Sequence, residues 1–141
     1  MMKKCLLILL ATIIGILSAD AQSINGYKYI EIQHQEDSPK DIEKRMAKEF
    51  ALLGFVVISS KEVEQLPQQE QTLVLMAEYI CRQSVQCLFK IKLKNQAGEI
   101  IYEDEQVAAA GFMTRKNDRQ SAIKKIFKQL RKLDYQFTPK Q

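Results

Sequence analysis

Residues 85–94 alternate between two kinds of side chain, and this pattern constrains the fold more than any other in the chain. One set of alternate positions is apolar and holds Cys87, Phe89, Ile91 and Leu93. The intervening positions at the end of the segment are basic and hold Lys90, Lys92 and Lys94. A period of two is typical of a β-strand with one buried face and one face toward water. The segment therefore predicts a sheet with a dry side and a wetter side.

Two neighbouring segments extend this strand into a three-stranded antiparallel meander. Thr72–Arg82 and Glu99–Ala108 are rich in β-branched and aromatic residues, and they flank the alternating strand in the sequence. Asn95 to Gly98 supplies the residue types of a tight turn for the second hairpin.

The apolar pattern also predicts a register for the first hairpin. If its tip is Gln83 to Val85, four apolar pairs face each other: Leu75 with Leu93, Ala77 with Ile91, Tyr79 with Phe89, and Cys81 with Cys87. A slip of one residue would mix the two faces of the sheet. In the second hairpin, two pairs of opposite charge are expected across the strands: Lys94 near Glu99 and Lys90 near Glu103.

A strand, a helix and a second strand are expected before the meander. Tyr27–Gln33 reads as a strand, and Ser38 begins a helix as its N-cap, with Pro39 at the first helical position and Asp41 as a capping-box acid. The helix presents one apolar stripe, formed by Ile42, Met46, Phe50 and Leu53, and it ends at Gly54. Phe55–Ile58 is expected to be a strand covered on both faces. Lys61–Gln71 is expected to be mainly a connection.

A second amphipathic helix closes the chain. Asn117 or Asp118 is its expected cap, and its apolar stripe consists of Ile123, Ile126, Phe127, Leu130 and Leu133. The element order is β-α-β-β-β-β-α. We therefore expect an α+β fold in which two amphipathic helices flank a mixed sheet of four to five strands.

The first twenty-one residues have the pattern of a cleaved secretory signal peptide. Lys3 and Lys4 precede an almost wholly apolar run from Leu6 to Leu17, and Ala19-Asp20-Ala21 fits a cleavage site. The apolar run is shorter than the roughly 20 residues needed to span a bilayer. We therefore expect a periplasmic or secreted protein in which residues 22–141 form a single domain.

Charge is distributed unevenly along the expected mature chain. Residues 22–114 contain ten basic and fourteen acidic side chains, whereas residues 115–141 contain nine basic and two acidic ones. The basic side chains of the closing helix include Lys124, Lys125, Lys128, Arg131 and Lys132. Such a helix either lies on an anionic membrane or glycan, or docks its apolar stripe on the sheet and leaves its lysines in water. The second arrangement is favoured, because the stripe contains no Trp and only one Phe.

No motif for catalysis, a cofactor or a metal ion is evident. His34 is the only histidine, and beside Glu36 and Asp37 it could act as a general base, although a lone histidine in a polar turn is usually just solvated. Cys81 and Cys87 form either a disulfide in an oxidising compartment or a pair of buried thiols. Their spacing does not match a redox or zinc motif.

The middle and flanking segments resemble a known family. The stretch TLVLMAEYI…VQCLFKIKLKNQAGEIIYEDEQV, residues 72–107, is similar to the CsgG, LpoB and TolB amino-terminal-like periplasmic domains. The resemblance implies a mixed sheet with flanking helices that acts as an interaction module of the cell envelope. No functional residue can be transferred, because the shared positions belong to the core and the turns.

Three functions follow as hypotheses. The leading one is a non-catalytic exported envelope protein that binds another protein. The second is a binder of anionic lipid or glycan through the C-terminal lysines, and the third is a small hydrolase centred on His34. Nucleic acid is not an expected partner of an exported chain.

Overall fold

The computed structural model describes residues 24–109 and 114–139, so the expected signal segment lies outside the described residues. One five-stranded sheet has the order β2-β1-β3-β4-β5. Its strands are β1 (Tyr29–Ile32), β2 (Val56–Ile58), β3 (Val74–Gln83), β4 (Gln86–Lys94) and β5 (Ile100–Ala109). The β1 strand pairs in parallel with β2 and β3, while β3, β4 and β5 form the expected antiparallel meander. The predicted α+β class with a mixed sheet is confirmed.

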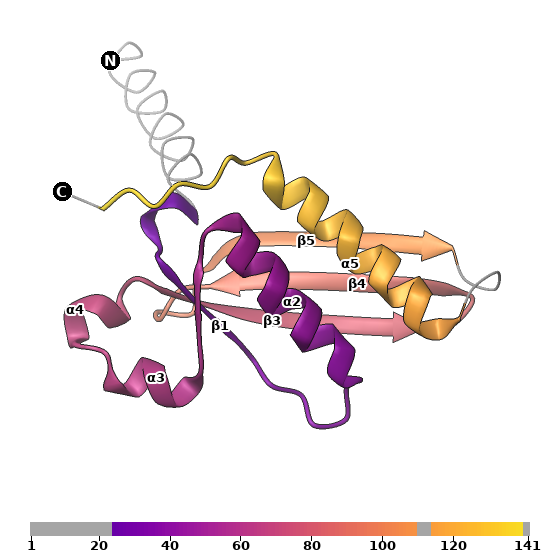
Figure 1. Cartoon of the computed structure of the whole chain (residues 1–141), viewed down its shortest axis with the longest axis horizontal. Coiled ribbons are helices and arrows are strands. Elements are labelled where there is room, and N and C mark those ends of the chain that lie inside the picture. Colours follow the sequence, from indigo (N-terminus) through magenta and orange to yellow (C-terminus); the bar gives the residue numbers. More distant parts are fainter. Residues whose placement is uncertain (1–23, 110–113, 140–141) are drawn as a thin grey trace, which may run out of the picture.

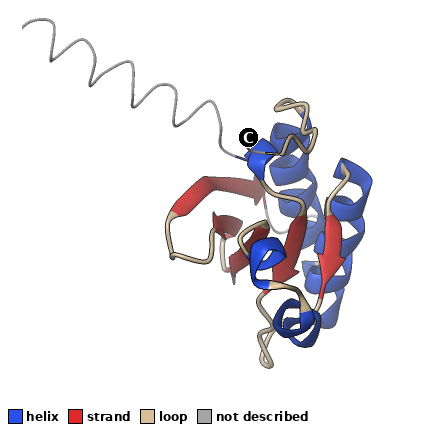
Figure 2. Ribbon diagram, turned by 90° about the vertical axis from the view of Figure 1, so that its left-hand side faces the viewer, coloured by secondary structure: helices blue, strands red, loops and turns tan. Residues whose placement is uncertain are grey.

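Two long helices lie side by side on one face of the sheet (Figures 1 and 2). They are α2 (Lys40–Leu53) and α5 (Arg115–Arg131). Three shorter helices complete the described fold: η1 (Ile24–Gly26), α3 (Ser60–Gln65) and α4 (Gln68–Gln71). The segment expected to be mainly a connection thus contains α3 and α4, and Ser59 caps α3 by accepting a hydrogen bond from the Glu62 N–H.

The core lies between the two long helices and the sheet. The helix side chains with no exposed surface are Ile42, Met46, Phe50, Ala122, Ile123, Ile126, Phe127 and Leu130. On the sheet side they meet Ile30, Leu75, Ala77, Phe89, Ile91 and Leu93, which are equally buried. Phe50 and Phe127 meet edge to face with their ring centroids 4.8 Å apart, so the two helices also contact each other directly.

The helix ends follow the sequence signals only in part. Gly54 ends α2 in the left-handed conformation with φ of 112°, as expected. At its start, Pro39 rather than Ser38 is the N-cap, and no side chain caps the helix. The cap of α5 is Thr114, whose hydroxyl accepts a hydrogen bond from the Asn117 N–H, so the prediction of Asn117 or Asp118 was wrong. The N-cap thus lies three residues before Asn117, and the Thr114 hydroxyl satisfies an N–H of the first turn that has no partner within the helix.

The first hairpin has a different register from the expected one. Tyr79 faces Ile91 and Cys81 faces Phe89, which is a shift of two residues along β4. An even shift keeps every side chain on its own face, so the apolar pattern cannot distinguish the two registers. The observed register places Glu78 opposite Lys92 and within 2.9 Å of Lys94, Oε2 to Nζ.

The second hairpin is partly as expected. Lys90 and Glu103 form the predicted ion pair at 2.8 Å, whereas Lys94 pairs with Glu78 instead of Glu99. Asn95 holds the turn with its side-chain oxygen, which accepts hydrogen bonds from the N–H groups of Ala97 and Glu99.

Two further expectations about burial were wrong. The β2 strand is an edge strand whose Val56 is 43% exposed, and it is not covered on both faces. Leu133 lies beyond the end of α5 and is 43% exposed, so it does not belong to the buried stripe. The chain instead folds back here through Tyr135, whose ring stacks on Phe55 with the ring centroids 3.8 Å apart.

We expect the contact between the two helices to dominate stability. Phe50→Ala should lower the free energy of unfolding by about 3–5 kcal/mol, because it removes a fully buried ring from the centre of the core. Leu52→Ala is the matched control on the same helix, and it should change the free energy by less than about 0.5 kcal/mol because Leu52 is 72% exposed. Urea unfolding followed by circular dichroism measures both. Equal effects of the two substitutions would contradict this core.

Candidate functional site

Two rows of lysines cover the outer surface of the helical layer. On α2 they recur every four residues, as Lys40, Lys44 and Lys48, and all three are exposed. On α5 and its C-cap the same spacing gives Lys124, Lys128 and Lys132, which are also exposed. Residues four apart lie above one another on the same face of a helix. We call these six lysines the basic helical face.

The carboxylates of the same two helices turn away from that surface. Asp41 accepts hydrogen bonds from the Arg119 guanidinium at 2.6, 2.9 and 3.1 Å and from Gln120 at 2.7 Å. Glu49 pairs with Arg45 at 3.0 Å and with Arg131 at 3.3 Å. These contacts join α2 to α5 near both ends, so the helices run parallel and form one continuous layer.

The remaining two carboxylates of the layer are also withdrawn. Glu43 accepts hydrogen bonds from the Tyr79 hydroxyl at 2.7 Å and from the Gln35 N–H at 3.1 Å. Asp118 is only 6% exposed. Neither α2 nor α5, both of which the structure describes in full, has an exposed carboxylate. The outer surface of the layer is therefore positively charged.

Of the five basic residues that the sequence suggested as contacts for an anionic surface, two are engaged within the protein and three face outward. Lys125 donates a hydrogen bond to the Val107 carbonyl of β5 at 2.7 Å, and Arg131 contacts Glu49. Lys124, Lys128 and Lys132 remain on the outer surface. Sequence reasoning missed the row on α2, although its spacing is visible as three lysines on the helix side opposite Ile42, Met46 and Phe50.

Asp41 is held in its charged form. The hydrogen bonds from Arg119 lower the pKa of the Asp41 carboxyl below its usual 3.8, and this effect outweighs the opposing effect of partial burial. A carboxyl group whose pKa is lowered in the folded state favours folding when it is charged, so we expect the ion pair between the two helices to stabilise the fold.

His34 lies at the edge of the structure. Its side chain is 72% exposed, and its Nδ1 atom lies 2.9 Å from Glu43 Oε1. Burial alone would raise the pKa of Glu43, but the hydrogen bonds from Tyr79, His34 and Gln35 outweigh it and lower that pKa. Among the described residues, His34 has no serine or cysteine as a hydrogen-bond partner.

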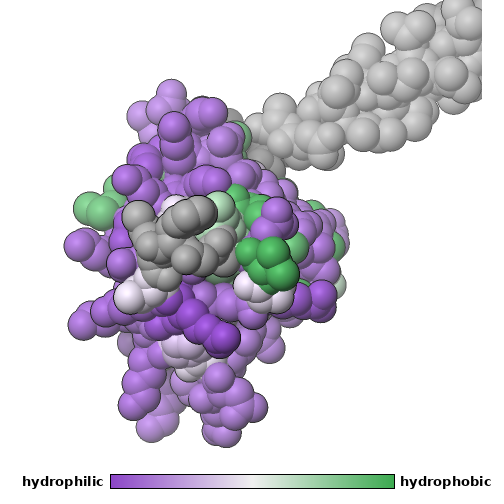
Figure 3. All heavy atoms as spheres, turned by 90° about the vertical axis from the view of Figure 1, so that its right-hand side faces the viewer, coloured by the Kyte–Doolittle hydropathy of each residue, from purple (hydrophilic) through white to green (hydrophobic). Residues whose placement is uncertain are grey.

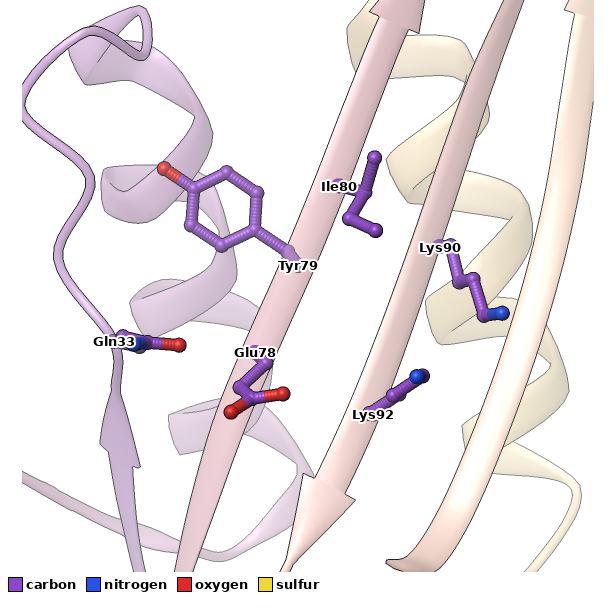
Figure 4. Close-up of a pocket in the computed structure, with 6 residues that line it drawn as sticks. All are labelled: Gln33, Glu78, Tyr79, Ile80, Lys90 and Lys92. Carbon is purple, nitrogen blue, oxygen red and sulfur yellow. The ribbon is translucent and has the colours of Figure 1, made fainter.

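A cavity of about 240 Å³ opens on the sheet face that the long helices leave free (Figure 4). It is lined by Gln33, Glu78, Tyr79, Ile80, Lys90 and Lys92. Glu78 and Lys90 are engaged in ion pairs with Lys94 and Glu103, respectively. The cavity thus presents mostly neutralised charges, and it lacks a nucleophile paired with a base.

The cysteines are free thiols on the core-facing side of the first hairpin. The predicted direct opposition of Cys81 and Cys87 was wrong, because Cys81 faces Phe89 and Cys87 faces Gln83. The two cysteines are instead diagonal neighbours. A second cavity, of about 200 Å³, is lined by Cys81 together with Gln35, Asp37, Ser38, Pro39 and Gln83.

The described part of the chain holds neither a metal-binding cluster nor a helix suited to span a membrane. No cluster of three or more His, Cys, Asp or Glu side chains is placed to hold a metal ion within residues 24–109 and 114–139. None of the helices in these ranges is both long and apolar enough to cross a bilayer.

Stability should fall in acid because of the ion pair between Asp41 and Arg119. The pKa of Asp41 is lowered in the folded state, so its contribution is present above the ordinary value of 3.8 and is lost as pH falls below it. Asp41→Asn should cost about 1–2 kcal/mol at pH 6 and flatten the acid decline. Urea unfolding between pH 6 and pH 2.5 measures this decline, with Glu64→Gln on exposed α3 as the control. An unchanged decline in Asp41→Asn would contradict the assignment.

Comparison with known proteins adds two structural likenesses. No family model matches the chain, and no curated protein matches it. A PelC dodecamer from Paraburkholderia phytofirmans is similar with a TM-score of 0.49 and 15% identity, covering 81% of this chain and 91% of that one. A single-substitution variant of that dodecamer is similar with a TM-score of 0.48 and 14% identity, covering 72% and 87%. Likeness at this level does not extend the function or the assembly of PelC to this chain.

Proposed function

We propose that this protein is a non-catalytic binding module of the cell envelope whose basic helical face binds an acidic surface of another protein. One observation carries the proposal: α2 and α5 expose their lysines and turn every carboxylate inward. A surface of one sign attracts and orients a partner of the opposite sign.

The burial of the helices favours a protein partner over a membrane. An interfacial helix inserts its apolar face into the bilayer. Here the apolar stripes of both helices are used in the core, where Phe50, Ile126 and Phe127 have no exposed surface. The lysines alone could still hold an anionic bilayer or glycan by charge, at about 1 kcal/mol for each lysine near the surface. Sedimentation with anionic vesicles distinguishes this alternative from a protein partner.

The proposal includes two further points: the protein is not an enzyme, and it is periplasmic or secreted. Exposure of His34 and the neutralised charges of the sheet-face cavity support a binding role over a hydrolase. The export pattern of residues 1–21 and the resemblance of residues 72–107 to the CsgG, LpoB and TolB domains support a periplasmic or secreted location.

Site-specific crosslinking in the native envelope tests the proposal. A photoreactive residue at Ser121, which is exposed beside Lys124 on α5, should give a discrete adduct with one acidic protein. The same residue at Glu64 of α3 should give no such adduct. Mass spectrometry identifies the partner, and an adduct formed equally at both positions would contradict the proposal.

Charge-reversal variants distinguish the contribution of the basic helical face to binding from the contribution of the overall net charge. Lys44→Glu, Lys124→Glu and Lys128→Glu together should abolish the Ser121 adduct, because they reverse the sign of the face. The matched control carries Lys28→Glu, Lys61→Glu and Arg82→Glu, which change the net charge equally on other surfaces and should leave the adduct intact. Equal loss in both triple variants would overturn the proposal.

Two further outcomes identify other partners. Sedimentation of the wild type with vesicles that contain anionic lipid, abolished by reversal of the helical face, would replace the protein partner with a membrane. An adduct between two copies of this chain at Ser121 would replace it with self-assembly.

A further inference from the structure

The end of the first hairpin holds two thiols that the proposed function does not use, and they lie beside the ion pair between Asp41 and Arg119. Cys81 lies on β3 and Cys87 on β4, and both point toward the helical layer. Tyr79 and Phe89 are diagonal neighbours on the same two strands, in the same relation as Cys81 and Cys87 but two residues further along. Their rings stack with centroids 6.0 Å apart. The twist of the sheet thus brings this diagonal together, and it places the two thiols side by side.

The two thiols differ in access to solvent. Cys81 is partly exposed and lines the cavity of about 200 Å³ between β3 and the segment that joins β1 to α2. Cys87 has no exposed surface. A reagent in solution can therefore reach Cys81, whereas Cys87 can react only with a sulfur atom that is already inside the protein. Figure 3 looks onto this end of the molecule, which is mostly hydrophilic.

An ion pair stands beside the thiols. The positive charge of Arg119 favours both thiolates, but Asp41 binds that guanidinium with three hydrogen bonds. Burial raises the pKa of Cys81 to about 12, with a further increase from Cys87, and burial also raises the pKa of Cys87. Asp41 next to Cys81 and Asp118 next to Cys87 add to these increases. The thiols are thus kept protonated and slow to react at neutral pH.

We propose that Cys81 and Cys87 are an ordered pair for thiol–disulfide exchange, in which Cys81 accepts an external disulfide and Cys87 resolves it. The Cys81 thiolate attacks one sulfur of the reagent, whose S–S bond breaks and releases the first reagent thiolate, which takes up a proton. The Cys87 thiolate then attacks the Cys81 sulfur and expels the second. Two protein thiols are oxidised to one disulfide, and one reagent disulfide is reduced to two thiols.

The order of the two steps, Cys81 first and Cys87 second, can be tested with oxidised glutathione. The reagent is added to the reduced protein that begins at Gln22. Mass spectrometry should show a closed disulfide without adduct in the wild type and a stable glutathione adduct in Cys87→Ser. Cys81→Ser should give no adduct when folded and should react only in urea. An equally fast reaction of folded Cys81→Ser, an adduct that persists in the wild type, or a wild type that does not react would each overturn the proposal.

The ion pair gives a second, independent test. Asp41→Asn should speed the first step, because it removes a negative charge that raises the pKa of Cys81 and releases the Arg119 guanidinium to favour the thiolate. Arg119→Gln should slow it, because the cation is lost. Simple loosening of the helices would speed both variants, and that result would contradict the electrostatic assignment. Glu49→Gln, at the far end of the same pair of helices, should leave the rate unchanged.

Discussion

The burial of two amphipathic helices on one face of a single sheet is the constraint on which the rest of the structure depends. Phe50 of α2 and Phe127 of α5 meet at the centre of this layer, and the apolar side chains that face the sheet, such as Met46 and Ile126, have no exposed surface. Because the apolar sides are used in the core, the opposite sides must face solvent. The location of the lysines on the outer surface is thus a direct consequence of the core.

The ion pairs between the helices turn this arrangement into a surface of one sign. Arg119 and Arg131 reach across to Asp41 and Glu49, so basic side chains of α5 neutralise acidic side chains of α2 inside the layer. The remaining lysines have no acidic neighbours on the outer surface of the two helices. Neither helix would form such a surface alone, because the separation of charge depends on their parallel side-by-side packing.

Patterns of period two and period 3.6 were sufficient to predict the sheet, both long helices and most of the core. They could not predict the register of the first hairpin, because a shift of two residues preserves both faces and the tip at Ser84 has no glycine or asparagine. They also could not assign β2 to an edge, since a short apolar run looks the same in either position. The spacing of Lys40, Lys44 and Lys48 on α2 is visible in the sequence. That these lysines extend the basic surface of α5 follows only from the packing of the two helices side by side.

The hydrogen bond from Lys125 to the Val107 carbonyl has a consequence for the colloidal behaviour of the protein. The β5 strand is the long outer strand of the sheet, and such strands invite pairing with other chains. The ammonium group occupies one backbone acceptor there, and Glu103 and Glu105 place negative charges along the same strand. Because Glu103 is paired with Lys90, two copies that approached each other edge to edge would bring together mainly their exposed Glu105 side chains, and this repulsion disfavours pairing of two sheets at β5.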